Sequence, residues 1–191
     1  QLPEDGVHIR WPDPPLAQEK RLNLYKIYAA RAFARANNLN RVMLDSTNPR
    51  LGIITTGKSY LDVRQALDDL GLDEALCASV GLRVLKVGMS WPLEPVSVHE
   101  FAQGLDEILV VEEKRQVIEY QLKEELYNWR PDVRPDVLGK FDEIEGDLHI
   151  RCLGYGINRE MIEALKRTHC AFAIGKHIQV ALTAPQIDSF M

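Results

Sequence analysis

The feature that most constrains the fold is an alternation of short apolar runs with segments of helical periodicity. The runs predicted to form strands are Leu51–Thr55, Arg83–Val87, Ile108–Val111 and Val137–Phe141. Helices are predicted between them, where apolar residues recur at spacings of three and four, at Ser59–Leu70, Ser97–Gly104 and Arg115–Trp129. Apolar strands that alternate with helices are typical of parallel sheets with both faces covered. The pattern therefore predicts an α/β fold of three layers, with a mostly parallel sheet and helices on both faces.

Less regular segments flank this alternation. Residues 1–18 hold four of the ten prolines, which predicts an extended arm. Residues 19–37 are predicted to form a helix with one apolar face, made by Leu22, Tyr25, Tyr28, Ala29, Ala32, Phe33 and Ala36. We therefore expect the arm at 1–18, a linking helix and connection at 19–50, an α/β domain at 51–145 and a C-terminal extension at 146–191. In the extension, strands are expected at His149–Leu153 and Ile178–Leu182, around a helix at Asn158–Thr168.

Charge and cysteine content narrow the class of protein. The formal net charge of -5 disfavours nucleic-acid binding, which needs a basic surface. No run approaches the roughly 20 apolar residues of a membrane-spanning helix. The three cysteines, Cys77, Cys152 and Cys170, show no paired spacing, which disfavours a disulfide framework or a metal site. We therefore expect a cytoplasmic protein that binds neither nucleic acid nor membrane.

Residues Gly52–Ser59 match the phosphate-loop pattern G-x-x-x-x-G-K-[ST] in full. In a true phosphate loop the strand precedes the first glycine, but here turn-forming residues precede it and the apolar run lies inside the motif. The favoured interpretation is a strand, a tight turn at Thr56-Gly57 and a helix from Lys58 or Ser59. This turn would still offer an anion the side chain of Lys58 and the N–H groups of Gly57 and Ser59. A nucleotide-binding loop remains the alternative.

Two further candidates follow predicted strands. Glu112 and Glu113 end a central strand, where paired carboxylates could act as acid and base. The favoured alternative is that they cap or pair with the next helix. Trp91 lies in the loop after another strand, where it would contact a ligand or only turn the chain. No Ser-His-Asp or Cys-His set can be assembled, so no catalytic residue and no metal ligand is assigned.

Several collinear stretches resemble the indolepyruvate ferredoxin oxidoreductase family in its long, fused bacterial form. They are RWPDPPLAQE at 10–19, LGIITTGKSYLDVRQALDDL at 51–70, VLKVGMSWPL at 84–93, ILVVEEKRQVIEYQLKEELYNW at 108–129 and VLGKFDE at 137–143. The resemblance spans roughly residues 8–145. It implies the fold of the transketolase C-terminal-like domain of that family.

The resemblance also implies a function. Members of the family oxidatively decarboxylate aryl 2-oxoacids on thiamine diphosphate and magnesium. They pass electrons to iron–sulfur clusters and ferredoxin, and the acyl group goes to coenzyme A. This domain would then support a homo-oligomer, contact the other domains and shape the approach to the active site. Gly57, Lys58 and Ser59 become candidates for coenzyme A contact, and Trp91, Glu112 and Glu113 for site-shaping.

Departures from the family pattern limit what this chain does alone. It lacks the Phe-Cys-Ser-Gly-Cys-Pro segment, the Gly-Asp-Gly…Asn motif and the ferredoxin-like cysteine run, so no cofactor ligand carries over. We expect the isolated chain to be inactive. Its start at Gln1, without Met, predicts a segment excised from a longer protein. The alternatives left open are a small nucleotide-binding protein using Gly52–Ser59, and a pure interaction module.

Overall fold

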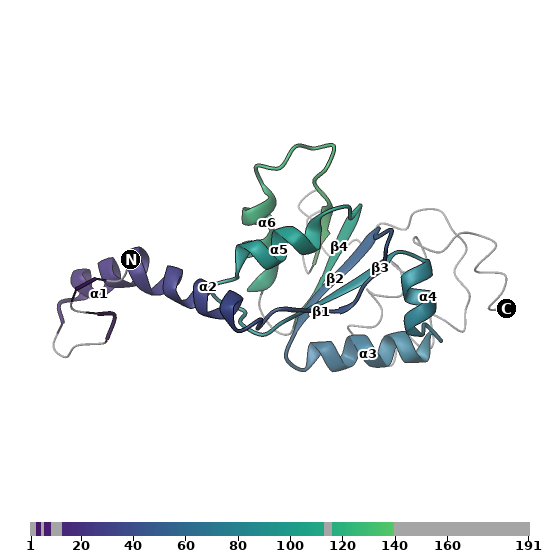
Figure 1. Ribbon diagram of the computed structural model, residues 1–191, viewed down its shortest axis with the longest axis horizontal. Helices are drawn as coiled ribbons and strands as arrows, with labels where there is room; N and C mark the ends of the chain where they lie inside the picture. The colour runs from purple at the N-terminus through teal and green to yellow at the C-terminus, as the bar shows by residue number, and fades with distance from the viewer. Residues whose placement is uncertain (1–2, 5, 9–12, 113–115, 140–191) are drawn as a thin grey trace.

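The computed structural model describes residues 3–4, 6–8, 13–112 and 116–139. The strands and helix predicted for 146–191 lie outside the described residues, as does Glu113. Figure 1 shows an α/β body from which the N-terminal helices project as an arm.

One sheet of five strands forms the centre of the body. Its strands are β1 (Arg41–Leu44), β2 (Leu51–Thr56), β3 (Leu82–Val87), β4 (Glu107–Val111) and β5 (Asp136–Leu138). They lie in the order β1-β3-β2-β4-β5, and every neighbouring pair is parallel except β1 with β3. The mostly parallel sheet is confirmed. The antiparallel edge strand β1 was not predicted, because three of its four side chains are exposed and it carries no apolar alternation.

Helices cover both faces of the sheet, as predicted. On one face lie α3 (Ser59–Asp69) and α4 (Glu74–Ser79), and on the other lie α5 (Pro95–Ala102) and α6 (Ile118–Leu126). Successive residues of β2 point into opposite cores, Ile53 toward one and Ile54 toward the other, and neither is exposed. Because both faces of β2 are covered, its sequence is a mostly apolar run rather than an alternation of apolar and polar residues.

Three helical segments form the arm, namely α1 (Pro15–Arg21), the π-helical η1 (Leu22–Lys26) and α2 (Ile27–Ala36). The helix begins at Pro15, inside the segment predicted to be extended. Proline suits the first turn of a helix, because its missing N–H has no partner there anyway. The helix ends before Asn38, whose φ of 49° breaks it near the predicted stop.

The apolar face predicted for the arm does not pack on the body. Tyr28 and Phe33 remain 63% and 60% exposed, whereas Ala34, on another side of α2, is the buried residue of that helix. Helical spacing identifies which residues share a face. It does not say which face a neighbouring element will cover.

Candidate functional site

Three loops follow the carboxyl ends of the parallel strands β2, β3 and β4 at one edge of the sheet. The strand order places the turn after β2 between the loops that follow β3 and β4. The hydroxyl of Thr56 donates to the carbonyl oxygen of Val87 over 2.9 Å and ties the ends of β2 and β3 together. In open parallel sheets, ligands bind outside the carboxyl ends of the strands. This edge is therefore the candidate functional site.

The phosphate-loop alternative is wrong. Residues 52–56 lie wholly within β2, in register with β3 on one side and β4 on the other. Their backbone N–H groups serve those ladders and cannot cradle a phosphate. Gly52 is needed for packing, since a Cβ there would lie 2.5 Å from Cδ1 of Leu105 and 2.9 Å from Cζ of Phe101. The interpretation as strand, turn and helix is confirmed.

The turn after β2 uses the three residues predicted to contact an anion. Gly57 has a φ of 53°, which favours glycine, and Lys58 is the N-cap of α3. The ammonium group of Lys58 lies 2.6 and 2.8 Å from the two carboxylate oxygens of Asp62, one helical turn along. Ser59 is only 1% exposed. An anion at this turn would compete with Asp62 for Lys58, so the anion site stays a prediction.

The loop after β3 presents Trp91 from a fixed frame. The side-chain amide of Gln121 on α6 donates to the carbonyl oxygen of Ser90 over 2.8 Å and accepts from the N–H of Leu93 over 2.7 Å. The N–H of Gly88 donates to Oδ1 of Asn40 over 3.1 Å. Between these anchors Trp91 is 55% exposed, and the Trp91–Pro92 peptide is cis. A held loop with an exposed indole is suited to contacting a ligand or a neighbouring domain.

Glu112 caps α6. One of its carboxylate oxygens accepts from the N–H groups of Val117 and Ile118 over 3.0 and 2.9 Å. The other accepts from the backbone N–H of Glu119 over 3.1 Å. Glu112 is 7% exposed, so these donors replace water around the carboxylate. The capping interpretation is confirmed for Glu112. A role in proton transfer is disfavoured, because both oxygens already accept from the helix that they stabilise.

A second buried carboxylate, which the sequence analysis missed, joins the arm to the body. Glu94 is 1% exposed, and it accepts from the N–H groups of Val96 and Ser97 at the start of α5. The guanidinium of Arg35 on α2 donates to the same carboxylate over 2.9 and 2.6 Å. Burial alone would raise the pKa of Glu94, but the Ser97 N–H and the Arg35 guanidinium outweigh it and hold the pKa below its usual range.

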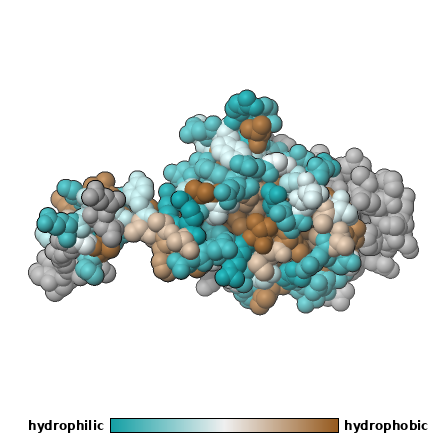
Figure 2. Space-filling view, in the orientation of Figure 1, coloured by the Kyte–Doolittle hydropathy of each residue, from teal (hydrophilic) through white to brown (hydrophobic). Residues whose placement is uncertain are grey.

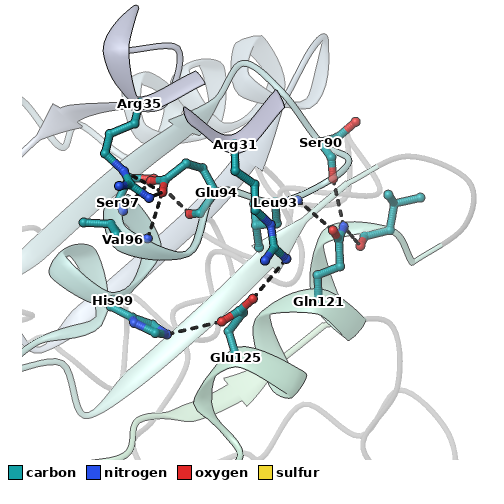
Figure 3. A network of polar contacts seen from close by, with 11 residues as sticks. Arg31, Arg35, Ser90, Leu93, Glu94, Val96, Ser97, His99, Gln121 and Glu125 are labelled. Atoms are coloured by element: carbon teal, nitrogen blue, oxygen red, sulfur yellow. Dashed lines mark hydrogen bonds and ion pairs between the residues drawn. The ribbon is translucent and has the colours of Figure 1, made fainter. Parts of the chain in front are cut away.

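A second ion pair between the arm and the body lies beside the pair of Arg35 with Glu94, as Figure 3 shows. Arg31 on α2 pairs with Glu125 on α6 over 3.2 Å, and His99 on α5 lies 3.6 Å from the same carboxylate. The arm is thus tied to α5 and α6, the helices on one face of the sheet. The Glu-Pro start of α5 is a capping signal visible in the sequence, but the pairing with Arg35, 59 residues away, is not.

Two buried polar groups near the candidate edge have no hydrogen-bond partner in the described part of the chain. They are the hydroxyl of Thr55, the next-to-last residue of β2, and Nε2 of Gln116, between β4 and α6. Thr55 is 0% and Gln116 9% exposed. Since buried polar groups are usually bonded, this edge keeps hydrogen-bonding capacity for a polar ligand or a further part of the protein.

The described residues do not fit a metal ion or an iron–sulfur cluster, two of the groups that the sequence resemblance implies. Among them no group of three or more His, Cys, Asp or Glu side chains could hold a metal ion. Their one cysteine, Cys77, is buried, and burial raises its pKa to about 11. An iron–sulfur cluster needs several thiolates, so none can be built on this segment. No helix in the described ranges has the length and apolar character to cross a membrane.

A sequence model of the indolepyruvate ferredoxin oxidoreductase middle domain matches residues 40–173. The chain belongs to this family. The match includes the unpredicted edge strand β1 and extends past residue 145, where the resemblance noted above ends.

Curated proteins that are similar in sequence carry the name of the same kind of enzyme. The indolepyruvate oxidoreductase subunit IorA of Methanothermobacter thermautotrophicus is 34% identical over 117 residues, which is 61% of this chain and 17% of that protein. The IorA subunit of Methanothermobacter marburgensis is 36% identical over 112 residues, or 58% and 17% of the two chains. That of Pyrococcus abyssi is 39% identical over 74 residues, or 39% and 10%. The chain thus spans less than a fifth of these relatives.

Two solved structures overlap with the fold at low similarity. A split-gene transketolase described as an inactive beta4 tetramer is 16% identical, with a TM-score of 0.45 over 75% of this chain and 42% of that one. The 2-oxoglutarate:ferredoxin oxidoreductase from Magnetococcus marinus is 18% identical, with a TM-score of 0.45 over 67% and 21%.

Proposed function

We propose that this chain is an internal domain of a thiamine-diphosphate-dependent oxidoreductase that passes electrons from indolepyruvate or related aryl 2-oxoacids to ferredoxin. Its membership of the middle-domain family is the observation that carries the proposal. The domain itself acts in assembly and in shaping the approach to the active site. We place thiamine diphosphate, magnesium and the iron–sulfur clusters elsewhere in the longer enzyme, because the described residues contain no group of three or more His, Cys, Asp or Glu side chains that could hold a metal ion.

The carboxyl edge of the sheet is the surface that would face the active site. It presents Trp91 from a loop fixed by Gln121, and its buried groups at Thr55 and Gln116 have hydrogen-bonding capacity left. Glu112 acts there indirectly, by fixing the start of α6. Lys58, with the N–H groups of Gly57 and Ser59, would contact coenzyme A by displacing Asp62 from the ammonium group.

The test uses the full-length gene product, assayed for ferredoxin reduction with indolepyruvate and coenzyme A. Trp91→Ala should lower kcat/KM about tenfold or more, because loss of an aromatic contact to a substrate or neighbouring domain costs about 1.4 kcal/mol or more. Tyr127→Ala is the matched control, since Tyr127 is 74% exposed at the other end of α6. Equal values of kcat/KM for the two variants would exclude a site-shaping role for Trp91. No indolepyruvate oxidation in the wild type would refute the activity.

The coenzyme A contact has its own test in the same assay. Lys58→Ala should raise the KM for coenzyme A without changing the KM for the 2-oxoacid. Asp62→Asn should lower the KM for coenzyme A, because it removes a carboxylate that competes with the anion for Lys58. An unchanged KM for coenzyme A in both variants would exclude the contact.

A further inference from the structure

The arm formed by α1, η1 and α2 carries apolar side chains that the body does not cover. Leu24, Tyr28 and Phe33 are 53%, 63% and 60% exposed, and Figure 2 shows hydrophobic residues on the surface of the arm. Figure 1 shows the arm pointing away from the sheet and its covering helices, with only its C-terminal end beside the body. At that end Arg31 and Arg35 tie α2 to α6 and α5. A helix held out in this way, with apolar side chains in water, is suited to a partner surface.

The charge of the arm identifies the chemistry of that surface. From Pro15 to Ala36 the sequence has five basic residues and one acidic residue, a net charge of +4, and two of the basic residues, Arg31 and Arg35, pair with carboxylates of the body. Residues 37–139 have 11 basic and 17 acidic residues, a net charge of -6. Lys20 and Lys26 have no ion-pair partner in the described part of the chain. A cationic helix beside exposed aromatic side chains fits an acidic protein surface.

The body itself offers such a surface. Asp68, Asp69, Asp73 and Glu74 are exposed at the corner where α3 ends and α4 begins, with one basic residue, Arg64, nearby in α3. Figure 1 places α4 at the end of the body opposite the arm. The arm cannot reach this corner in its own copy, but the arm of a second copy can.

We propose that the arm of one copy docks on the acidic α3–α4 corner of a second copy, and that the second arm docks reciprocally on the first. Two-fold symmetry makes such an exchange closed, because each copy donates one arm and accepts one. The exposed apolar side chains of the arm supply the non-polar contact, and Lys20 and Lys26 face the acidic corner. This inference concerns assembly and holds whether or not the proposed activity does.

A charge swap tests the contact in the full 191-residue chain. The arm variant carries Lys20→Glu and Lys26→Glu, and the corner variant carries Asp68→Lys and Asp69→Lys. Each variant alone should dissociate, since the swapped side chains then face charges of their own sign. Mixed in equal amounts, they should form a heterodimer in which both contacts are again between opposite charges. Sedimentation equilibrium measures the masses, and circular dichroism checks that each variant is folded.

The wild type should be a dimer whose Kd weakens about tenfold or more between low and high salt, because screening shortens the reach of the charges. Arg130→Glu with Arg134→Glu is the matched control, as it makes the same change of net charge on an exposed segment away from both surfaces. The inference is overturned by a monomeric wild type, by an arm variant that dimerises like the control, or by a mixture that stays monomeric. A monomer would indicate that another domain or subunit covers the arm.

Discussion

Replacing Glu94 by glutamine tests whether this buried carboxylate is what joins the arm to the body. The carboxylate accepts four hydrogen bonds, two from the N–H groups that begin α5 and two from the guanidinium of Arg35. Glutamine has nearly the same shape but no charge, and one of its two terminal atoms can only donate. Glu94→Gln therefore keeps the packing and removes about half of the accepting capacity.

The magnitude follows from the number and kind of bonds lost. A hydrogen bond to a charged group contributes about 1.5–3 kcal/mol, and the two bonds to Arg35 are partly compensated because that side chain is 53% exposed and can turn to water. We expect Glu94→Gln to lower the free energy of unfolding by about 2–3 kcal/mol. In a protein of this size each kcal/mol corresponds to about 2–4 °C, so Tm should fall by roughly 4–12 °C.

The effect should depend on pH in a defined direction. The pKa of Glu94 is lower in the folded state than its ordinary value of 4.5. A depressed folded pKa adds stability that is fully present above the unfolded pKa and is lost as pH falls through the folded pKa. The difference in stability between wild type and Glu94→Gln should therefore be constant near neutrality. It should begin to shrink below about pH 4.5 and vanish as the folded wild-type carboxylate takes up its proton at lower pH.

Urea unfolding at several pH values between 7 and 3.5 is the assay. Glu100→Gln is the control, because Glu100 lies on the same helix and is exposed. It should change the free energy of unfolding by less than about 0.5 kcal/mol. A Glu94→Gln effect as small as that of the control at pH 7, or one that does not shrink in acid, would refute this account of the junction.

Two other substitutions probe the sheet and its edge. Glu112→Ala should destabilise the chain by about 1–3 kcal/mol, since it leaves three N–H groups at the start of α6 without their acceptor. Hydrogen exchange at the amide of Ile118 should become faster, and an unchanged exchange rate there would argue against the cap. Gly52→Ala should cost about 1–3 kcal/mol in thermal or urea unfolding, because the new methyl group would lie 2.5 Å from Leu105 and 2.9 Å from Phe101. A neutral outcome would mean that α5 and its loop can yield, and that Gly52 is not required for packing.

The pattern of apolar residues alone was enough to predict the three central strands of the sheet. The runs that became β2, β3 and β4 are mostly apolar, and the helices after them have apolar residues at helical spacing. These strands are recognisable in the sequence because burial on both faces of a sheet requires apolar residues at most positions of a strand. The turn at Gly57 could be placed in the same way, since the residues before Gly52 are turn-forming and favour a strand, a turn and a helix over a phosphate loop.

Only the tertiary structure decided the pairing between distant segments. The edge strand β1 has few buried side chains, and the short helix α4 has a single buried residue, Cys77, so neither leaves a clear pattern. The role of Glu112 depends on where α6 begins, and that of Glu94 on Arg35, 59 residues earlier. The sequence by itself determined which residues share a face of an element. Which face is covered, and by what, depends on contacts between elements far apart in the chain, because a pattern of spacing carries no information about its partner.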